Sequence, residues 1–190
     1  MGVTKQFAFA AMISLTAVAC SGKNDRASRD ATPGGTPGAA GTSGTSMGDR
    51  NFVEDMAQDG QAEVLLGQLA EQKATSPEVK EFAALMVRDH SQANQELKSI
   101  AAKYNVELKP DLADEHKDLR ERLAKKSGAD FDREFIKAMV DDHEHAVDDA
   151  KDKAEHSENA DIKQWASQTL PTLQQHLERA RQIHESLEKQ

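Results

Sequence analysis

The fold of this chain is decided by two similar stretches, Phe82-Ala83-Ala84-Leu85-Met86-Val87-Arg88-Asp89-His90 and Phe135-Ile136-Lys137-Ala138-Met139-Val140-Asp141-Asp142-His143. In each stretch Phe, Met and His recur every four residues, which places them on one face of an amphipathic α-helix. The histidine therefore falls on the apolar stripe and not on the solvated face. A further stretch places His176 among Leu173, Ala180 and Ile183 in the same way. Three imidazoles on apolar stripes predict a polar site inside a helical bundle.

A helical period runs from Asn51 to the end of the chain. Thr75-Ser76-Pro77-Glu78 is typical of a helix start, with a hydroxyl cap, a proline in the first turn and an acid near the positive end of the helix dipole. Asn159 is predicted to cap the last helix, and Pro171 is predicted to interrupt it and to kink it one turn before His176. The expected helices cover about residues 51–74, 77–104, 110–126, 130 onward and 160 onward.

Two hairpins of long helices joined by a long crossover define the fold class. We predict an all-α, ferritin-like four-helix bundle over residues 51–188, with a short extra helix in the crossover. No segment has the alternating pattern of a strand.

The first 50 residues show targeting signals in place of a helical period. An apolar run at residues 7–18 is too short to span a bilayer as a mature helix and ends at Ala17-Val18-Ala19-Cys20, which resembles a bacterial lipoprotein cleavage box. We predict a signal peptide at 1–19, then a lipidated Cys20 and a flexible linker to residue 50, because residues 21–50 hold seven of the eleven glycines. The alternative is an ordinary signal peptide with an incidental cysteine.

The net charge and the single cysteine of the chain limit which partners and covalent links are expected. The net charge is −9, and about −10 once residues 1–19 and their Lys5 are removed, which argues against a nucleic-acid partner. A single cysteine allows no intramolecular disulfide. Because Ser21 follows Cys20, we expect a periplasm-facing outer-membrane lipoprotein whose membrane contact is the lipid on Cys20. No protein partner is predicted.

Four polar side chains are expected at one depth of the bundle. At about 1.5 Å per residue, His90 lies about 20 Å beyond the start of its helix, and so does His143. His176 and Glu63 lie near the middle of their helices. The four helices therefore offer three imidazoles and a carboxylate to one layer, a ligand set that suits zinc, iron or copper.

Neighbouring residues refine this prediction. Met86 and Met139 lie one turn before two of the histidines and, as soft ligands, favour copper. Asp89 and Asp142 suit a second shell around the metal better than direct ligation. The alternative is that His90, His143, His176 and Glu63 only satisfy one another as a structural network. The remaining histidines are predicted to lie on the surface: His116, His145, His156 and His184.

The sequence does not point to an enzyme. No central histidine has a glutamate three residues before it, so the Glu-x-x-His motif of di-iron bundles is missing. No activated serine or cysteine nucleophile and no glycine-rich phosphate loop is found. We expect a protein that binds one transition ion for storage, buffering or stress protection. The alternative is a non-catalytic structural or interaction protein of the periplasm.

An ordered series of motifs runs through the helical part of the chain: Glu63-Val64-Leu65-Leu66-Gly67-Gln68-Leu69-Ala70, Val79-Lys80-Glu81-Phe82-Ala83, Met86-Val87-Arg88-Asp89-His90, Phe131-Asp132-Arg133, Asp142-His143 and Leu170-Pro171-Thr172-Leu173-Gln174-Gln175-His176-Leu177. This series resembles a known family, the domain of unknown function 4142. The likeness covers about residues 51–187. Members are bacterial exported or putative outer-membrane proteins grouped with ferritin-like folds. The resemblance implies a bundle and an envelope location but no established activity.

Overall fold

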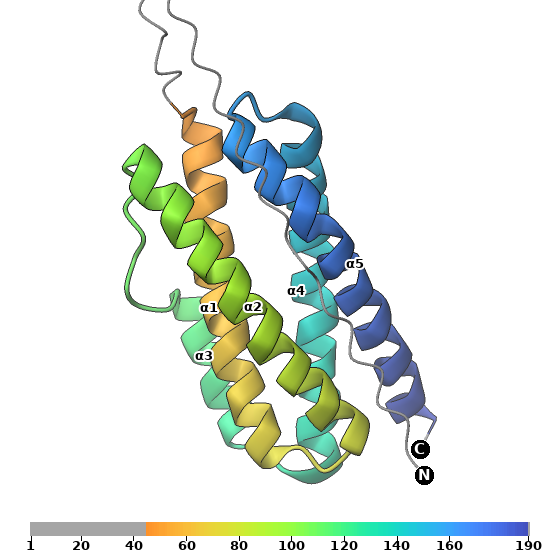
Figure 1. Cartoon of the computed structure of the whole chain (residues 1–190). Coiled ribbons are helices and arrows are strands. Elements are labelled where there is room, and N and C mark those ends of the chain that lie inside the picture. Colours follow the sequence, from red (N-terminus) through yellow and green to blue (C-terminus); the bar gives the residue numbers. More distant parts are fainter. Residues whose placement is uncertain (1–44, 190) are drawn as a thin grey trace, which may run out of the picture. The chain divides into compact units, whose positions relative to one another are not determined.

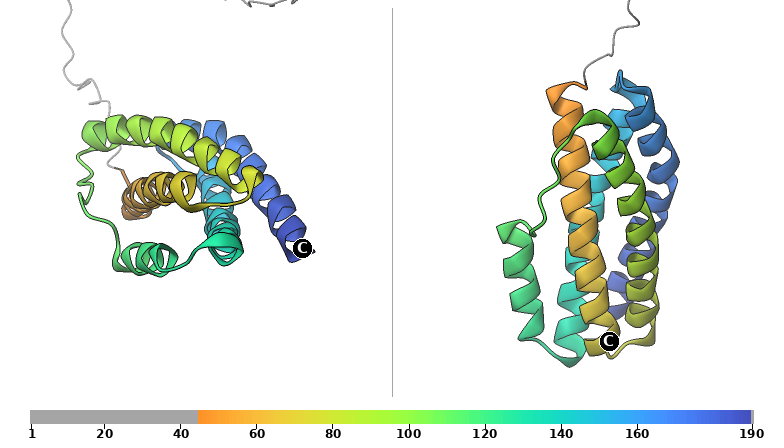
Figure 2. Two further views of the ribbon diagram at one scale, coloured as in Figure 1. Left: turned by 90° about the horizontal axis from the view of Figure 1, so that it is seen from below. Right: turned by 60° about the vertical axis from the view of Figure 1, so that its left-hand side comes forward.

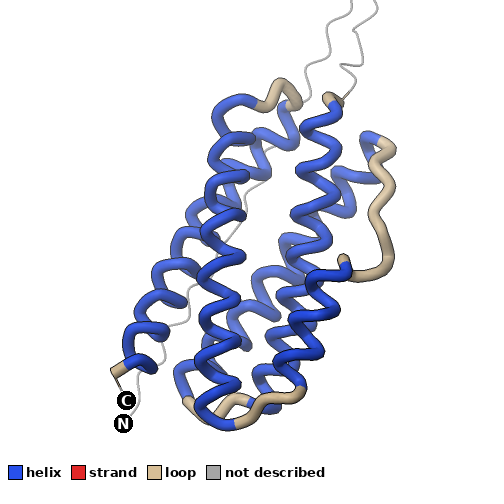
Figure 3. Tube along the Cα trace, turned by 180° about the vertical axis from the view of Figure 1, so that it is seen from behind, coloured by secondary structure: helices blue, strands red, loops and turns tan. Residues whose placement is uncertain are grey.

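A computed structural model describes residues 45–189, which form five α-helices and no strand (Figures 1 and 3). The predicted all-α fold is therefore confirmed. The predicted signal peptide, Cys20 and nearly all of the linker lie outside the described residues. Within residues 45–189 no helix is both long and apolar enough to cross a membrane. The helices are α1 (Met47–Lys73), α2 (Pro77–Tyr104), α3 (Asp114–Ala124), α4 (Gly128–His156) and α5 (Ala160–Glu188).

The four long helices form the predicted bundle of two hairpins. α1 packs mainly against α2, and α4 mainly against α5. The crossover between the hairpins contains α3, which lies along the outside of α1 and α4 and is not inserted among the long helices (Figure 2). The short extra helix therefore covers one side of the bundle.

Two helix starts differ from the sequence prediction, and the helix that contains Pro171 is continuous. α1 begins at Met47, earlier than expected, because the Ser46 hydroxyl accepts a hydrogen bond from the Asp49 amide at 3.0 Å. α3 begins at Asp114, later than predicted. α5, for which a kink at Pro171 was predicted, continues through this residue as one helix. Pro171 removes the hydrogen bond to the Ser167 carbonyl, but both residues are exposed, so water can satisfy that oxygen.

A carboxylate from α4 fixes the turn between α1 and α2. Asp132 is only 1% exposed. Its oxygens accept hydrogen bonds from the Thr75 amide at 3.0 Å, the Thr75 hydroxyl at 2.6 Å and the Ser76 amide at 2.8 Å. These bonds satisfy backbone donors at the start of α2 that have no partner within the helix. Asp132 therefore joins the two hairpins at this end of the bundle.

The core consists of two hydrophobic clusters separated by a polar layer. One cluster contains Leu66, Met86, Met139 and Ala180, and the other contains Met56, Leu97, Ala150 and Leu173. On every long helix, one polar residue separates the members of the two clusters. These four residues, all buried, are Glu63, His90, His143 and His176. The polar layer therefore spans the whole cross-section of the bundle.

Candidate metal centre

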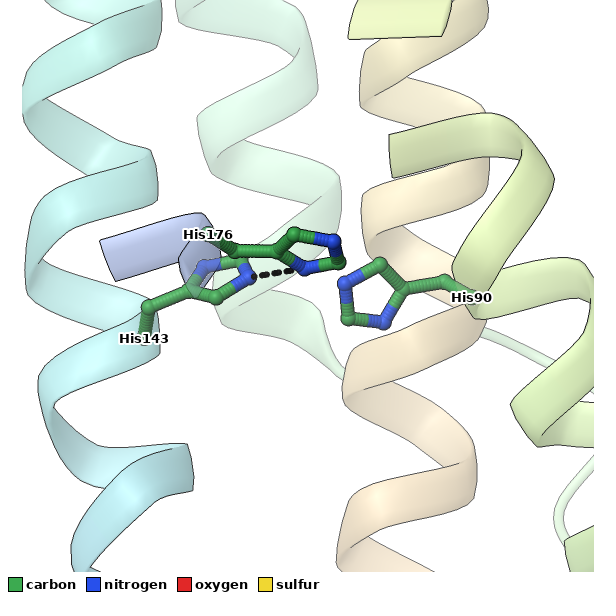
Figure 4. Close-up of side chains that lie close together, drawn as sticks. All are labelled: His90, His143 and His176. Atoms are coloured by element: carbon green, nitrogen blue, oxygen red, sulfur yellow. Dashed lines mark hydrogen bonds between the residues drawn. The ribbon is translucent and has the colours of Figure 1, made fainter. Parts of the chain in front are cut away.

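The polar layer brings together one side chain from each long helix, as the sequence predicted. The three imidazole rings come from α2, α4 and α5 and face one another (Figure 4). Their ring centroids lie 5.4 Å apart for His90–His143 and 5.3 Å apart for His90–His176 and for His143–His176. The shared depth follows from the helical rise, which places the middles of antiparallel helices at one level.

Each imidazole has one ring nitrogen held by an oxygen. His90 Nδ1 lies 2.7 Å from Glu63 Oε2. His143 Nδ1 lies 2.9 Å from the carbonyl oxygen of Met139 and 3.2 Å from Glu63 Oε1. His176 Nε2 lies 3.0 Å from Asp89 Oδ2. Because a carbonyl or an ionised carboxylate can only accept, these three nitrogens carry the protons.

When the imidazoles are neutral, the opposite ring nitrogens are therefore left with lone pairs, and they converge. His143 Nε2 lies 3.3 Å from His176 Nδ1 (Figure 4). In two neutral rings with these tautomers, no proton remains to occupy the space between them. His90 Nε2 is buried and has no hydrogen-bond partner in the described part of the chain. One ring nitrogen from each histidine lies within 4.8 Å of the others.

Burial and neighbouring charges set the protonation of the layer. Burial alone would raise the pKa of Glu63, but the charges of His90 and His143 and the hydrogen bond from His90 lower that pKa to about 2. Burial lowers the pKa of His143, and it lowers the pKa of His176 to about 4 despite the hydrogen bond to Asp89. Against the effect of burial, the Glu63 carboxylate raises the pKa of His90. At neutral pH, Glu63 is thus ionised and two of the imidazoles are neutral, the form that binds metals.

The other predicted site residues take different positions. Both Glu63 oxygens face protonated Nδ1 atoms, so Glu63 lies behind the imidazoles and not among the converging nitrogens. Asp89 lies behind His176 in the same way, and Arg88 Nε donates to it at 2.7 Å. Within residues 45–189, Asp142 forms no hydrogen bond with these imidazoles. Met86 and Met139 are fully buried in one hydrophobic cluster.

One prediction about the outer histidines is wrong. His145 and His156 are exposed and His184 is half-buried, but the His116 side chain is only 11% exposed. His116 belongs to the narrow stripe of α3 with Leu119 and Leu123, and that stripe faces the bundle.

His116 lines a pocket of about 520 Å³ beside the centre. The same pocket is lined by Asp59, Asn94 and Trp165, which the sequence pattern did not single out. Asp59 precedes Glu63 by four residues and Asn94 follows His90 by four, so helical spacing was the signal that could have found them. Burial is the main reason why the pKa of both Asp59 and Asp142 is raised to about 7, and nearby carboxylates, above all that of Glu63, raise it further.

Fold and site together define a class: an all-helical bundle protein with a buried three-histidine centre. The chain belongs to the family described as Domain of unknown function (DUF4142), which matches residues 34–183. No curated protein matches the chain.

Solved structures with the same fold include several of CopM. The structure of CopM in the Cu(I)-bound form is 26% identical, with a TM-score of 0.62, and the match covers 73% of this chain and 96% of that chain. The Ag-bound form obtained by co-crystallisation is 25% identical, with the same coverage and a TM-score of 0.60. A DUF305 fragment from Deinococcus radiodurans is 14% identical, with a TM-score of 0.65 and coverage of 77% of this chain and 99% of the fragment. That last match concerns the fold alone.

Proposed function

We propose that this protein binds one copper ion through His90 Nε2, His143 Nε2 and His176 Nδ1 and serves as a copper buffer or store in the cell envelope. The observation that carries the proposal is the pair of facing lone pairs, His143 Nε2 and His176 Nδ1, 3.3 Å apart. Two unprotonated nitrogens at this distance repel each other unless a cation lies between them.

The spacing of the nitrogens fits a bound ion. Two nitrogen ligands at about 2.0–2.1 Å from a tetrahedral metal ion are separated by about 3.4 Å. His143 and His176 have nearly this separation. The unpartnered Nε2 of His90 supplies the third donor, since one nitrogen of each ring lies within 4.8 Å of the others.

Copper is favoured over the iron and zinc that the sequence also allowed. Imidazole ligands suit all three metals, but affinity in a given nitrogen site is highest for Cu²⁺ among the divalent ions. CopM, at 26% identity, has been solved in a Cu(I)-bound form. Met86 and Met139 precede two of the ligands by one turn, and we keep them as candidate soft ligands for Cu(I).

The residues behind the ligands orient them. In this proposal Glu63 fixes the rings of His90 and His143, and Asp89 fixes the ring of His176. Carboxylates that hold the second nitrogen of a ligating histidine select its tautomer and raise its basicity. Glu63 thus acts as a positioning residue, where the sequence had suggested a fourth ligand.

A metal titration tests the proposal. The full chain, purified without a histidine tag, should bind one equivalent of copper, and copper should raise its melting temperature. His143→Ala should lose the bound copper, whereas His156→Ala, on an exposed residue outside the pocket, should retain it. Absence of bound copper together with an unchanged melting temperature would leave the purely structural layer as the explanation.

The envelope location is a separate proposal that rests on Cys20 and the segment before it. Lipid on this cysteine would attach the domain to the periplasmic face of the outer membrane without a spanning helix. Cys20→Ala should release the protein into the soluble periplasmic fraction. If the variant stays with the membrane, the lipid assignment is wrong.

A further inference from the structure

Every buried polar side-chain atom that has no hydrogen-bond partner in residues 45–189 belongs to a residue that lines the pocket beside the centre. Its lining includes His90 and His176 of the centre together with residues of all five helices. Buried polar groups are normally satisfied by protein, water or ligand. Their gathering in one pocket indicates that the pocket holds polar contents. The four atoms are His90 Nε2, Asn94 Oδ1, His116 Nδ1 and Trp165 Nε1.

The charge of the lining selects cations. Six carboxyl groups line the pocket against the single guanidinium of Arg122, and two of them, Asp59 and Asp142, are partly protonated at neutral pH because their pKa is about 7. A cavity lined by one sign of charge raises the local concentration of the opposite ion. The carboxylates belong to Asp59, Glu63, Asp89, Glu115, Asp118 and Asp142.

The pocket is also the polar approach to the buried ligands. Above and below the layer, the two hydrophobic clusters close the bundle. A hydrated cation crosses an apolar core at great cost. His143 is 0% exposed and does not line the pocket, whereas His90 and His176 do. An ion that enters through the pocket therefore meets these two imidazoles before His143.

His116 on α3 repeats the construction of the central imidazoles. Its Nε2 lies 3.5 Å from Asp59 Oδ1, so a carboxylate stands behind one nitrogen. Its Nδ1 is buried without a partner. His116 therefore offers a further imidazole lone pair in the pocket, outside the group of three that can share one ion. The single imidazole of His116 holds a metal ion more weakly than the three-imidazole centre does.

We propose that this pocket is the route by which metal enters and leaves the three-histidine centre, and that His116, positioned by Asp59, is the ligand that binds the ion in transit. The inference rests on the proposed metal binding. Because the transit ligand contacts the ion only between solvent and centre, its removal raises the barrier for entry and release by the same amount. The equilibrium affinity then stays unchanged.

Trp165 provides the measurement. It is the only tryptophan of the chain and lines the pocket, so quenching of its fluorescence by Cu²⁺ reports arrival in a stopped-flow experiment on the full chain. Release is followed by recovery of the fluorescence after mixing with excess EDTA. His116→Leu should slow both rates about tenfold, equivalent to about 1.4 kcal/mol in the barrier, while the dissociation constant remains the same.

A matched control and a second variant complete the test. His156 is exposed, does not line the pocket, and has its Nδ1 3.1 Å from Asp152 Oδ1. His156→Leu should therefore keep the wild-type rates of copper entry and release. Asp59→Asn retains the imidazole of His116, so it should slow copper entry less than His116→Leu does. Because the variant removes a carboxylate from the pocket, the rate of copper entry should also depend less on salt concentration. Circular dichroism checks that the variants fold.

The outcomes separate the two proposals. Wild-type entry and release rates in both His116→Leu and Asp59→Asn would overturn the route. A large loss of affinity with an unchanged entry rate would make His116 a resident ligand and also overturn it. If the wild-type chain binds no copper at all, both the proposed function and the route fail.

Discussion

Replacing Glu63 by glutamine should destabilise the protein by about 3 kcal/mol at neutral pH. In the folded chain the pKa of Glu63 is lowered from its ordinary 4.5 to about 2, and a shift of this size corresponds to about 3 kcal/mol of stability. The physical reason is that one ionised carboxylate accepts from Nδ1 of both His90 and His143. An amide has a single acceptor oxygen, so its NH₂ group would face one of the two donors.

The effect should depend on pH with a definite sign. Because the folded-state pKa of Glu63 is depressed, its stabilisation is complete above 4.5 and is lost as the pH falls toward 2. Urea unfolding at a series of pH values should show the full wild-type–variant difference at about pH 7 and a much smaller one near pH 3. In the same variant, copper affinity should fall about 10–100-fold, since the ligands lose their orienting carboxylate.

Glu144→Gln is the matched control. Glu144 pairs with Arg181 at 2.6 Å, but both side chains are about half exposed, so this change should cost less than about 1 kcal/mol. The reasoning would be refuted by a Glu63→Gln variant whose free energy of unfolding at neutral pH lies within about 0.5 kcal/mol of the wild-type value. Glu63 would then not be the charge that organises the layer.

Three further changes test other parts of the structure. Because the pKa of His176 is lowered from 6.5 to about 4, the unfolded chain takes up a proton that the folded chain excludes. As the pH falls from 6.5 to 4, the free energy of unfolding of wild type, measured in urea, should fall by up to about 3 kcal/mol more than that of His176→Gln. Parallel curves of stability against pH for the two proteins would contradict this. Asp132→Asn should cost about 2–3 kcal/mol, measured by thermal unfolding, whereas exposed Asp130→Asn should cost less than about 0.5 kcal/mol; equal losses would remove the assigned role in the turn. Gly67→Ala should lower the melting temperature, because a Cβ there would lie 2.9 Å from a Val87 methyl and 3.0 Å from the Ala83 carbonyl oxygen, while Gly48→Ala, whose nearest neighbour is 3.7 Å away, should not.

Several features of the fold and the site could be predicted from single helices. The stripe of Phe82, Met86 and His90 follows from the period of one helix, and all three residues are buried as expected. The common depth of His90 and His143 required only the helical rise, because each lies about 20 Å beyond the start of its helix and α2 and α4 begin at the same end of the bundle (Figure 1). The cap at Asn159 is likewise local, since its side chain accepts from the amides of Asp161 and Ile162 in the same turn.

The contacts between the helices were decided by the tertiary structure. Sequence periodicity placed Glu63 at the right depth but could not show that its two oxygens face protonated nitrogens and not the converging lone pairs. It also placed His116 on a stripe without showing that α3 turns this stripe toward a pocket shared with Asp59.

The physical reason is the range of the interactions. Helical period and capping act over about four residues and can be derived from neighbouring residues in the chain. Which nitrogen of His143 carries its proton depends partly on a carbonyl one turn away, but the direction of its lone pair has meaning only because His176, 33 residues later, lies 3.3 Å from it. The sequence by itself determined which residues enter the layer, and the packing of distant helices decided which atoms face one another there.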